Sequence, residues 1–156
     1  MTQTQILLTN FEEIRRRSIK LWKGISAENY FWKPDTSAMH CLEMVRHVLE
    51  AEYWFLDLIK SRGDSSNFIS PWVDRPYTNL QDELDFAKPY RVIFIDAVKS
   101  FTTKDLNTIE IHRVEKKQRR ILSDYLQRIA YHEAVHTGQM LSYLRTLRVE
   151  IPSVWD

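Results

Sequence analysis

The sequence contains a single cysteine, three glycines and five prolines among its 156 residues. One cysteine, Cys41, forms no intrachain disulfide, which is typical of proteins from a reducing compartment. Three glycines provide too few flexible turn positions for a β-sandwich or a β-barrel. The composition therefore favours a helical protein, and we expect it to be cytoplasmic.

Long apolar runs and an excess of one charge are also missing. No run approaches the ~18 apolar residues of a membrane-spanning helix, and Met1 to Asn10 lacks the pattern of a secretion signal. Twenty-two Lys and Arg residues balance 21 Asp and Glu residues, for a net charge of +1. Such a chain has no general positive field for nucleic acid. We expect neither a membrane nor a nucleic acid as a partner.

The apolar residues, in contrast, are plentiful and recur with the period of an amphipathic helix. Expected helices cover Gln5 to Ile25, a second segment starting after Asp35, Thr36 or Ser37 and ending near Arg62-Gly63, Leu80 to Phe101 after an Asn79 cap, and Ile121 to Leu147. Each has one apolar stripe to bury, which predicts an all-α four-helix bundle. Residues 1–156 fit one domain of ordinary size.

The connections between the second and third helices and between the third and fourth are long for a bundle, at about sixteen residues or more. Thr102 to Arg120 contains a short alternating piece and a basic run, and the pattern assigns it no structure. Lys116 to Arg120 is interpreted as a solvated face before the last helix. Pro89 predicts a kink in the third helix, because proline removes a backbone donor there.

The second helix has an easily read inward seam with steps of three and four residues. The seam consists of Cys41, Met44, Val48, Ala51, Phe55 and Leu58. The opposite, solvated stripe is predicted to consist of Glu43, Arg46, Glu50, Asp57 and Lys60. Within the seam, Cys41 is interpreted as a packed apolar residue.

Histidines one turn apart on the last helix form the most informative motif. His132 and His136 point the same way from a helix, so both imidazoles can bind one metal ion. His47 lies on the shoulder of the apolar seam of the second helix, from which it can face the last helix. His40 is a reserve candidate nearer the end of the helix. His112 lies outside the helical patterns and is interpreted as a loop or short-strand side chain.

Glu133 lies in the middle of the buried face of the last helix. A carboxylate there needs a partner, because its desolvation is otherwise unfavourable by several kcal/mol. Three roles stay open: a general base for water at the metal, an acceptor that orients an imidazole, or a buried acid paired with another residue. His-Glu-x-x-His also occurs in zinc proteases, but the sequence shows no strand that would align a peptide substrate.

The sequence resembles the DinB/YfiT-like superfamily. The string from His132 through Glu133 and His136 to Gln139 fits the family's H-E-x-x-H-x-G-Q motif, and Arg46 to Glu50 fits its second-helix signature. The resemblance covers nearly the whole chain. It implies a metal-binding four-helix bundle with His47, His132 and His136 as ligands.

Three histidine ligands leave coordination positions open, as in a reactive metal site. We expect one divalent transition-metal ion, with Zn or Ni first and Co, Fe or Cu as alternatives. The resemblance implies a metal-dependent hydrolase or a thiol S-transferase that acts on a small molecule and uses a low-molecular-weight thiol. The alternative is a non-catalytic metal-dependent binding or sensor module. The family name alone suggests a DNA-binding effector, which the near-neutral charge disfavours.

Gly138 is predicted to point away from the core. A position without a side chain on the outside of a long helix permits another helix to come close. We therefore expect a homodimer.

Overall fold

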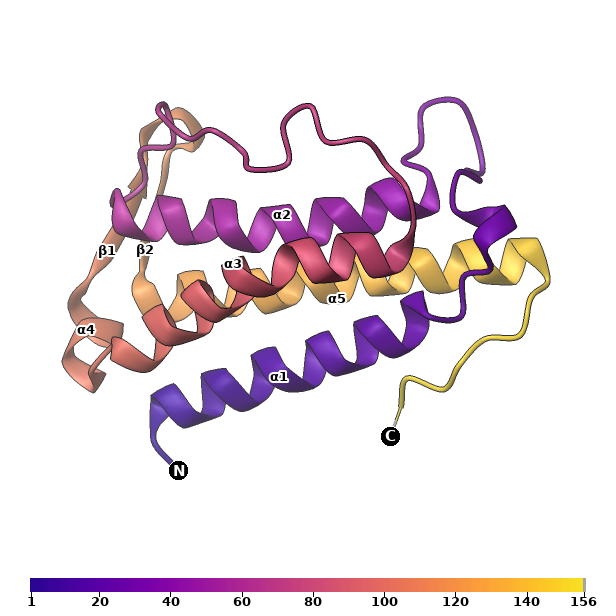
Figure 1. Cartoon of the computed structure of the whole chain (residues 1–156). Coiled ribbons are helices and arrows are strands. Elements are labelled where there is room, and N and C mark those ends of the chain that lie inside the picture. Colours follow the sequence, from indigo (N-terminus) through magenta and orange to yellow (C-terminus); the bar gives the residue numbers. More distant parts are fainter. Residues whose placement is uncertain (156) are drawn as a thin grey trace.

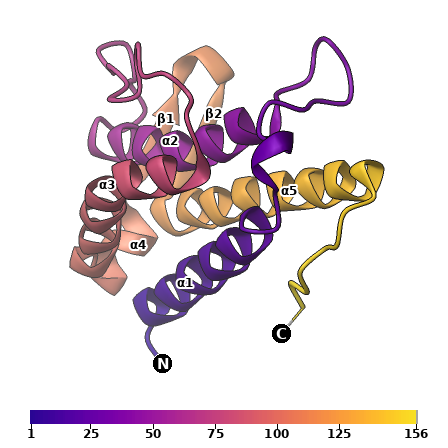
Figure 2. The same ribbon diagram turned by 45° about the vertical axis from the view of Figure 1, so that its right-hand side comes forward.

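The computed structural model describes residues 1–155, and most of them are helical (Figure 1). The four long helices are α1 (Gln3–Trp22), α2 (Cys41–Lys60), α3 (Leu80–Ser100) and α5 (Leu122–Leu147). Helices α1 and α2 each pack against both α3 and α5, so the four lie side by side around a shared core (Figure 2). Among the residues described, no helix has the length and apolar character needed to cross a bilayer.

The helix ends follow local capping chemistry. Thr2 forms a capping box with Gln5 at the start of α1, and Asn79 caps α3 as expected. The expected start of the second helix after Asp35 to Ser37 is wrong. Asp35 instead accepts hydrogen bonds from the backbone N–H groups of Ser37 and Ala38, which closes a separate turn, and α2 begins at Cys41.

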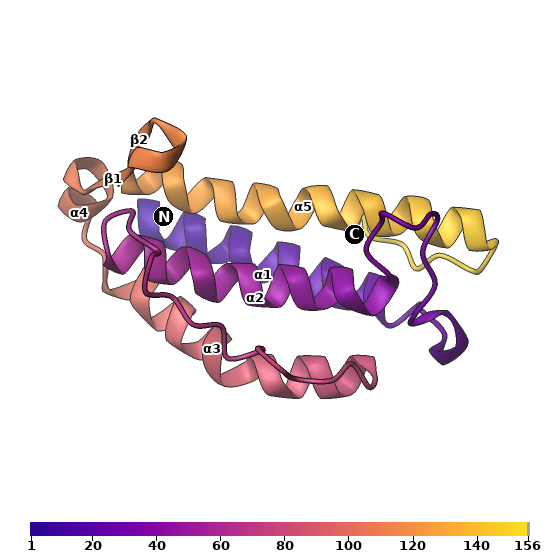
Figure 3. The ribbon, with the colours of Figure 1, turned by 90° about the horizontal axis from the view of Figure 1, so that it is seen from above.

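Helix α3 is a single element that contains Pro89. It bends about halfway along its length, as Figure 3 shows, in agreement with the predicted kink. The connection between α2 and α3 is the expected long loop, with Trp72 buried against the core. After α5 the chain turns back toward α1, where Val154 is buried (Figures 1 and 2).

The expectation of an all-α protein is wrong in one segment. Residues 102–121 form the short helix α4 (Thr103–Thr108) and the antiparallel strands β1 (Glu110–Arg113) and β2 (Gln118–Ile121). Ile111 buries its side chain, whereas β2 has alternating half-buried and exposed residues. A hairpin with so little apolar alternation gives a weak sequence signal.

The hairpin packs against the end of α2 through Gly63. Gly63 has a φ of 118°, and a Cβ there would lie 2.2 Å from the backbone oxygen of His112. The backbone N–H of His112 also donates to the carbonyl of Arg62 at 2.9 Å. This junction therefore requires glycine, both for its backbone angle and for the close approach.

The buried apolar residues form two clusters along the long axis of the molecule. One cluster includes Trp22, Leu42 and Leu144, and the other includes Phe11, Phe94 and Leu126. Charged side chains from all four long helices form a separate network, which we call the charged layer: the buried Arg15, Glu52 and Glu133 and the half-buried Arg91. The core is therefore interrupted by ion pairs.

The predicted solvated stripe of α2 is wrong at Arg46. This side chain is buried, donates to both carboxylate oxygens of Glu83 on α3, and donates to the backbone carbonyls of Arg75 and Pro76. Because α2 packs against α3 as well as α5, its buried face is wider than the predicted seam.

Candidate metal centre

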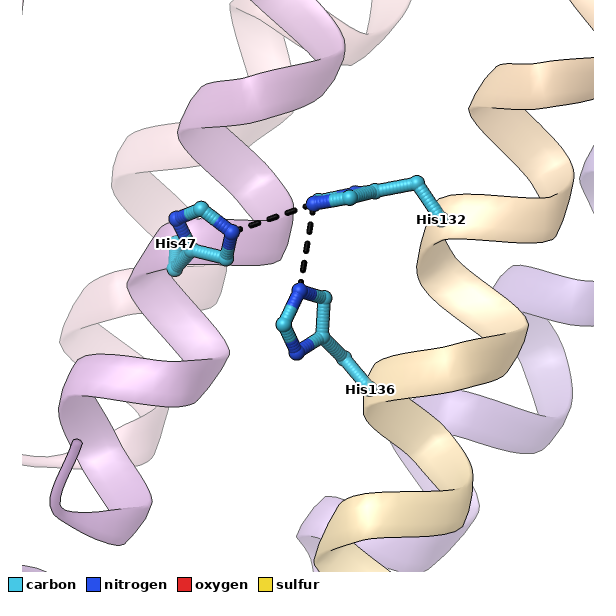
Figure 4. Close-up of side chains that lie close together, drawn as sticks. All are labelled: His47, His132 and His136. Atoms are coloured by element: carbon cyan, nitrogen blue, oxygen red, sulfur yellow. Dashed lines mark hydrogen bonds between the residues drawn. The ribbon is translucent and has the colours of Figure 1, made fainter. Parts of the chain in front are cut away.

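His47 from α2 and His132 and His136 from α5 point toward one another in the space between the two helices (Figure 4). The Nε2 atom of His132 lies 3.0 Å from Nε2 of His47 and 3.1 Å from Nε2 of His136. One nitrogen from each ring lies within 4.8 Å of the others, and all three residues are half-buried. The structure therefore brings together the three histidines that the sequence singled out.

Hydrogen bonding alone does not satisfy this arrangement. A neutral imidazole nitrogen carries either one hydrogen or one lone pair, so Nε2 of His132 forms one good hydrogen bond, not two. Two nitrogens that each lie ~2.0–2.1 Å from one metal ion are themselves about 3.0–3.4 Å apart. The spacing and the chemistry of the donors therefore fit a shared divalent cation.

The surroundings keep the three imidazoles neutral. Burial lowers the pKa of His132 to about 4, with a further contribution from the neighbouring histidines. Burial also lowers the pKa values of His47 and His136. Neutral rings have free lone pairs, which metal binding requires.

Gln139 sets the orientation of His136. The amide oxygen of Gln139 accepts a hydrogen bond from Nδ1 of His136 at 2.6 Å. With its hydrogen on Nδ1, the neutral ring has its lone pair on Nε2, which faces the other histidines. Sequence reasoning used Gln139 as part of a motif without giving it a role, although its spacing of three residues from His136 on a helix was a usable signal.

Glu133 forms a two-point ion pair with Arg15 of α1. Its Oε1 and Oε2 atoms accept from Nε and Nη2 of Arg15 at 2.8 and 3.0 Å. Burial acts to raise the pKa of Glu133, but Arg15 outweighs it and the net pKa is lowered. Of the three roles left open by the sequence, the structure shows the buried acid with a partner.

The other candidates lie outside the histidine cluster. His40 is the N-cap of α2, where its Nδ1 accepts from the backbone N–H of Glu43 at 3.0 Å. His112 lies on β1, in agreement with the short-strand interpretation. Cys41 is fully buried, and burial raises the pKa of its thiol to about 11, so it is a packed and unreactive residue.

The pH dependence of metal binding follows from the lowered pKa values. Protons compete with metal for a folded-state imidazole only near or below its pKa, so we expect release to have its midpoint below pH 6.5, the ordinary value for histidine. The folded protein also loses stability as the pH falls below 6.5, because these histidines have a higher pKa in the unfolded chain and bind protons there more readily. Equilibrium dialysis between pH 7.5 and 4.5 measures this midpoint, and release centred at or above pH 6.5 would contradict it.

Comparison with known proteins supports the family resemblance. The profile of the DinB superfamily matches residues 10–140. The Bacillus subtilis protein YjoA is 26% identical over 159 residues, covering 97% of this chain and 96% of its own. Its crystal structure, described as that of a DinB-like protein, has a TM-score of 0.70 at 24% identity, with 95% of this chain and 96% of that chain covered.

A second solved structure, of a DinB-family protein from Exiguobacterium sibiricum 255-15, has a TM-score of 0.75 at 16% identity, covering 98% of this chain and 97% of that one. At 16% sequence identity, this similarity shows a shared fold only. The profile match, by contrast, extends over most of the chain and includes all three clustered histidines. The chain therefore belongs to the DinB superfamily.

Proposed function

We propose that this protein binds one divalent transition-metal ion through Nε2 of His47, His132 and His136 and that it is a metal-dependent enzyme. The observation that carries the proposal is the convergence of three neutral imidazole nitrogens that hydrogen bonds alone do not satisfy. Zn and Ni are the preferred ions, and Co, Fe and Cu suit the same donors.

The reaction is hydrolysis or the transfer of a low-molecular-weight thiol to a small-molecule substrate. When bound, the ion supplies Lewis acidity, which activates water or keeps a thiol in its nucleophilic form. The three histidines leave room in the coordination sphere, and their half-buried positions leave the centre accessible to small molecules.

Glu133 supports the metal centre by holding α5, which carries His132 and His136, in place. Its carboxylate is ionised and held by Arg15, so it fixes α5 against α1 next to the two histidines of α5. A general base needs a free lone pair within reach of the proton that it accepts. We therefore assign the proton-accepting role in the reaction to another group and treat Glu133 as a positioning residue.

The proposal also covers the fold family, the location and the assembly of the protein. The four long helices form a YfiT-like four-helix bundle, and residues 1–156 form one domain. The chain works in the cytoplasm without nucleic acid or membrane partners. It forms a homodimer through the outer face of α5 at Gly138, where a Cβ would meet no atom within 4 Å apart from the adjoining residues and the local helix backbone.

The proposal is tested by metal loading followed by two kinds of assay. We expect dialysis against Zn, Ni or Co and then elemental analysis to give one ion per chain. The loaded protein is then assayed for hydrolysis of ester and amide substrates and for transfer of a thiol to an electrophile, with chelator-treated protein as the control. Metal-dependent turnover in either assay supports the enzyme, and the absence of bound metal would refute it.

The alternative is a non-catalytic metal-dependent binding or sensor module. A bound ion without turnover, and without any change in its spectrum on addition of thiol, would favour that alternative.

A further inference from the structure

A cleft of about 270 Å³ lies beside the histidine cluster, and His47 forms one of its walls. The other lining residues are Glu50, Ala51, Trp54 and Phe68. Residues 47, 50, 51 and 54 are three or four positions apart, so they share one face of α2. Phe68 comes from the connection between α2 and α3. His47 therefore belongs both to the histidine cluster and to the wall of this cleft.

Glu50 is the only charged residue lining this cleft, and within the described part of the chain it makes no hydrogen bond or ion pair. Its natural helical partner would be Arg46, one turn earlier. Arg46, however, is fully engaged with Glu83 and with the carbonyls of Arg75 and Pro76. The carboxylate of Glu50 therefore lines the cleft without a direct ion-pair partner among the described residues, and Arg46 and His47 act on it only at longer range.

Aromatic rings complete the environment of that carboxylate. Trp54 and Phe68 line the same cleft, and aromatic faces attract cations. The ring of Trp54 already has one cation, because the guanidinium of Arg113 lies 5.0 Å from its centroid. Arg113 is paired with Glu115, so its charge is balanced outside the cleft. The cleft itself thus combines one carboxylate with aromatic surface, which suits a small cationic group.

We propose that Glu50 is a specificity-determining residue that binds the protonated amine of the substrate. The substrate class is then a small aminothiol or another small amine whose reactive group lies a few bonds from the ammonium. A volume of about 270 Å³ accommodates such a group and is small for a nucleotide or a peptide. This inference rests on the proposed function, because the histidine centre holds the other end of the molecule.

The test uses three small thiols of different charge on full-length protein loaded with cobalt. Cysteamine is cationic, 2-mercaptoethanol is neutral and thioglycolate is anionic, and cobalt–thiolate absorption together with calorimetry reports binding without any activity assay. Because the three thiols differ in acidity, the affinity of each thiol for a variant is compared with the affinity of the same thiol for the wild-type protein. Glu12→Gln is the matched control, since Glu12 is exposed on α1.

We expect Glu50→Gln to weaken cysteamine binding about 10- to 100-fold and to leave 2-mercaptoethanol binding within about twofold, as for loss of a charged hydrogen bond. Glu50→Lys should reverse the preference in favour of thioglycolate. Both variants should still bind one cobalt ion.

The outcomes separate this inference from the proposed function. Wild-type protein that binds no metal refutes the proposed function. Metal-loaded protein that binds no thiol, or in which Glu50→Gln weakens all three thiols equally, overturns only the role of Glu50 in selecting an amine. Loss of cobalt from Glu50→Gln would assign Glu50 to the support of His47 and would likewise overturn it.

Discussion

Replacement of Arg15 by methionine is expected to lower the free energy of unfolding by about 3–5 kcal/mol, the range for removing one partner from a buried ion pair. Arg15 is 7% exposed and donates to both oxygens of Glu133 and to Glu52. Without it Glu133 becomes a buried carboxylate without its cation, whereas Glu52 keeps Arg91. Ser18 and, at longer range, Arg91 also favour the ionised form of Glu133, but Arg91 is already held by Glu52 and by the backbone carbonyl of Phe11.

Urea denaturation measures this change, and Arg16→Met is the matched control. Arg16 is exposed and pairs with Glu13 on the surface of the same helix, so we expect its replacement to change the stability by less than about 1 kcal/mol. The defect of Arg15→Met should shrink as the pH falls from 7 to 5. A buried carboxylate without a partner has a raised pKa, so the folded variant takes up a proton before the unfolded chain does. Equal effects of the two substitutions would contradict the buried ion pair.

Replacement of His132 by alanine is expected to abolish metal binding at micromolar concentrations. His132 is the central residue of the cluster, since its Nε2 atom lies close to those of both His47 and His136. Loss of a residue that merely orients a ligand weakens binding about 10–100-fold, and loss of a ligand itself should exceed that range. The stabilisation by metal, about 4 kcal/mol at a thousandfold excess over the dissociation constant, should disappear with it.

Elemental analysis and thermal melting with and without chelator test this expectation, with two histidine controls. His112→Ala removes a histidine from β1 and should retain one ion per chain. His40→Ala should lower the stability by removing the cap of α2, yet still bind metal. Retention of a full equivalent of metal by His132→Ala would refute the three-histidine centre.

Sequence patterns predicted the long helices, although the start of α2 was expected too early. The apolar period located α3 and α5 to within about one residue at each end. The spacing of His132 and His136 placed both on one face of α5, and the position of His47 beside the apolar seam placed it opposite them. These inferences succeeded because a helix translates spacing along the chain directly into direction in space.

Neither the charged layer nor the hairpin could be predicted from the periodic pattern of the sequence. A periodic pattern treats arginine as exposed, whereas Arg15 and Arg46 are buried against acids that lie 118 and 37 residues away in the sequence. Only the tertiary fold brings such partners together. The hairpin of β1 and β2 has four residues in each strand, too few to establish a pattern of alternation.

The charged layer also has a consequence for how the helices can slide. Apolar side chains tolerate repacking, but an arginine fork and a carboxylate match in only one alignment. A shift of α5 by one turn, about 5.4 Å, would separate Glu133 from the guanidinium of Arg15, whereas Arg15 would keep Glu52. The cost of breaking this ion pair therefore opposes any movement of α5 along its axis. Because Glu133 directly follows His132, the same ion pair keeps His132 opposite His47 on α2.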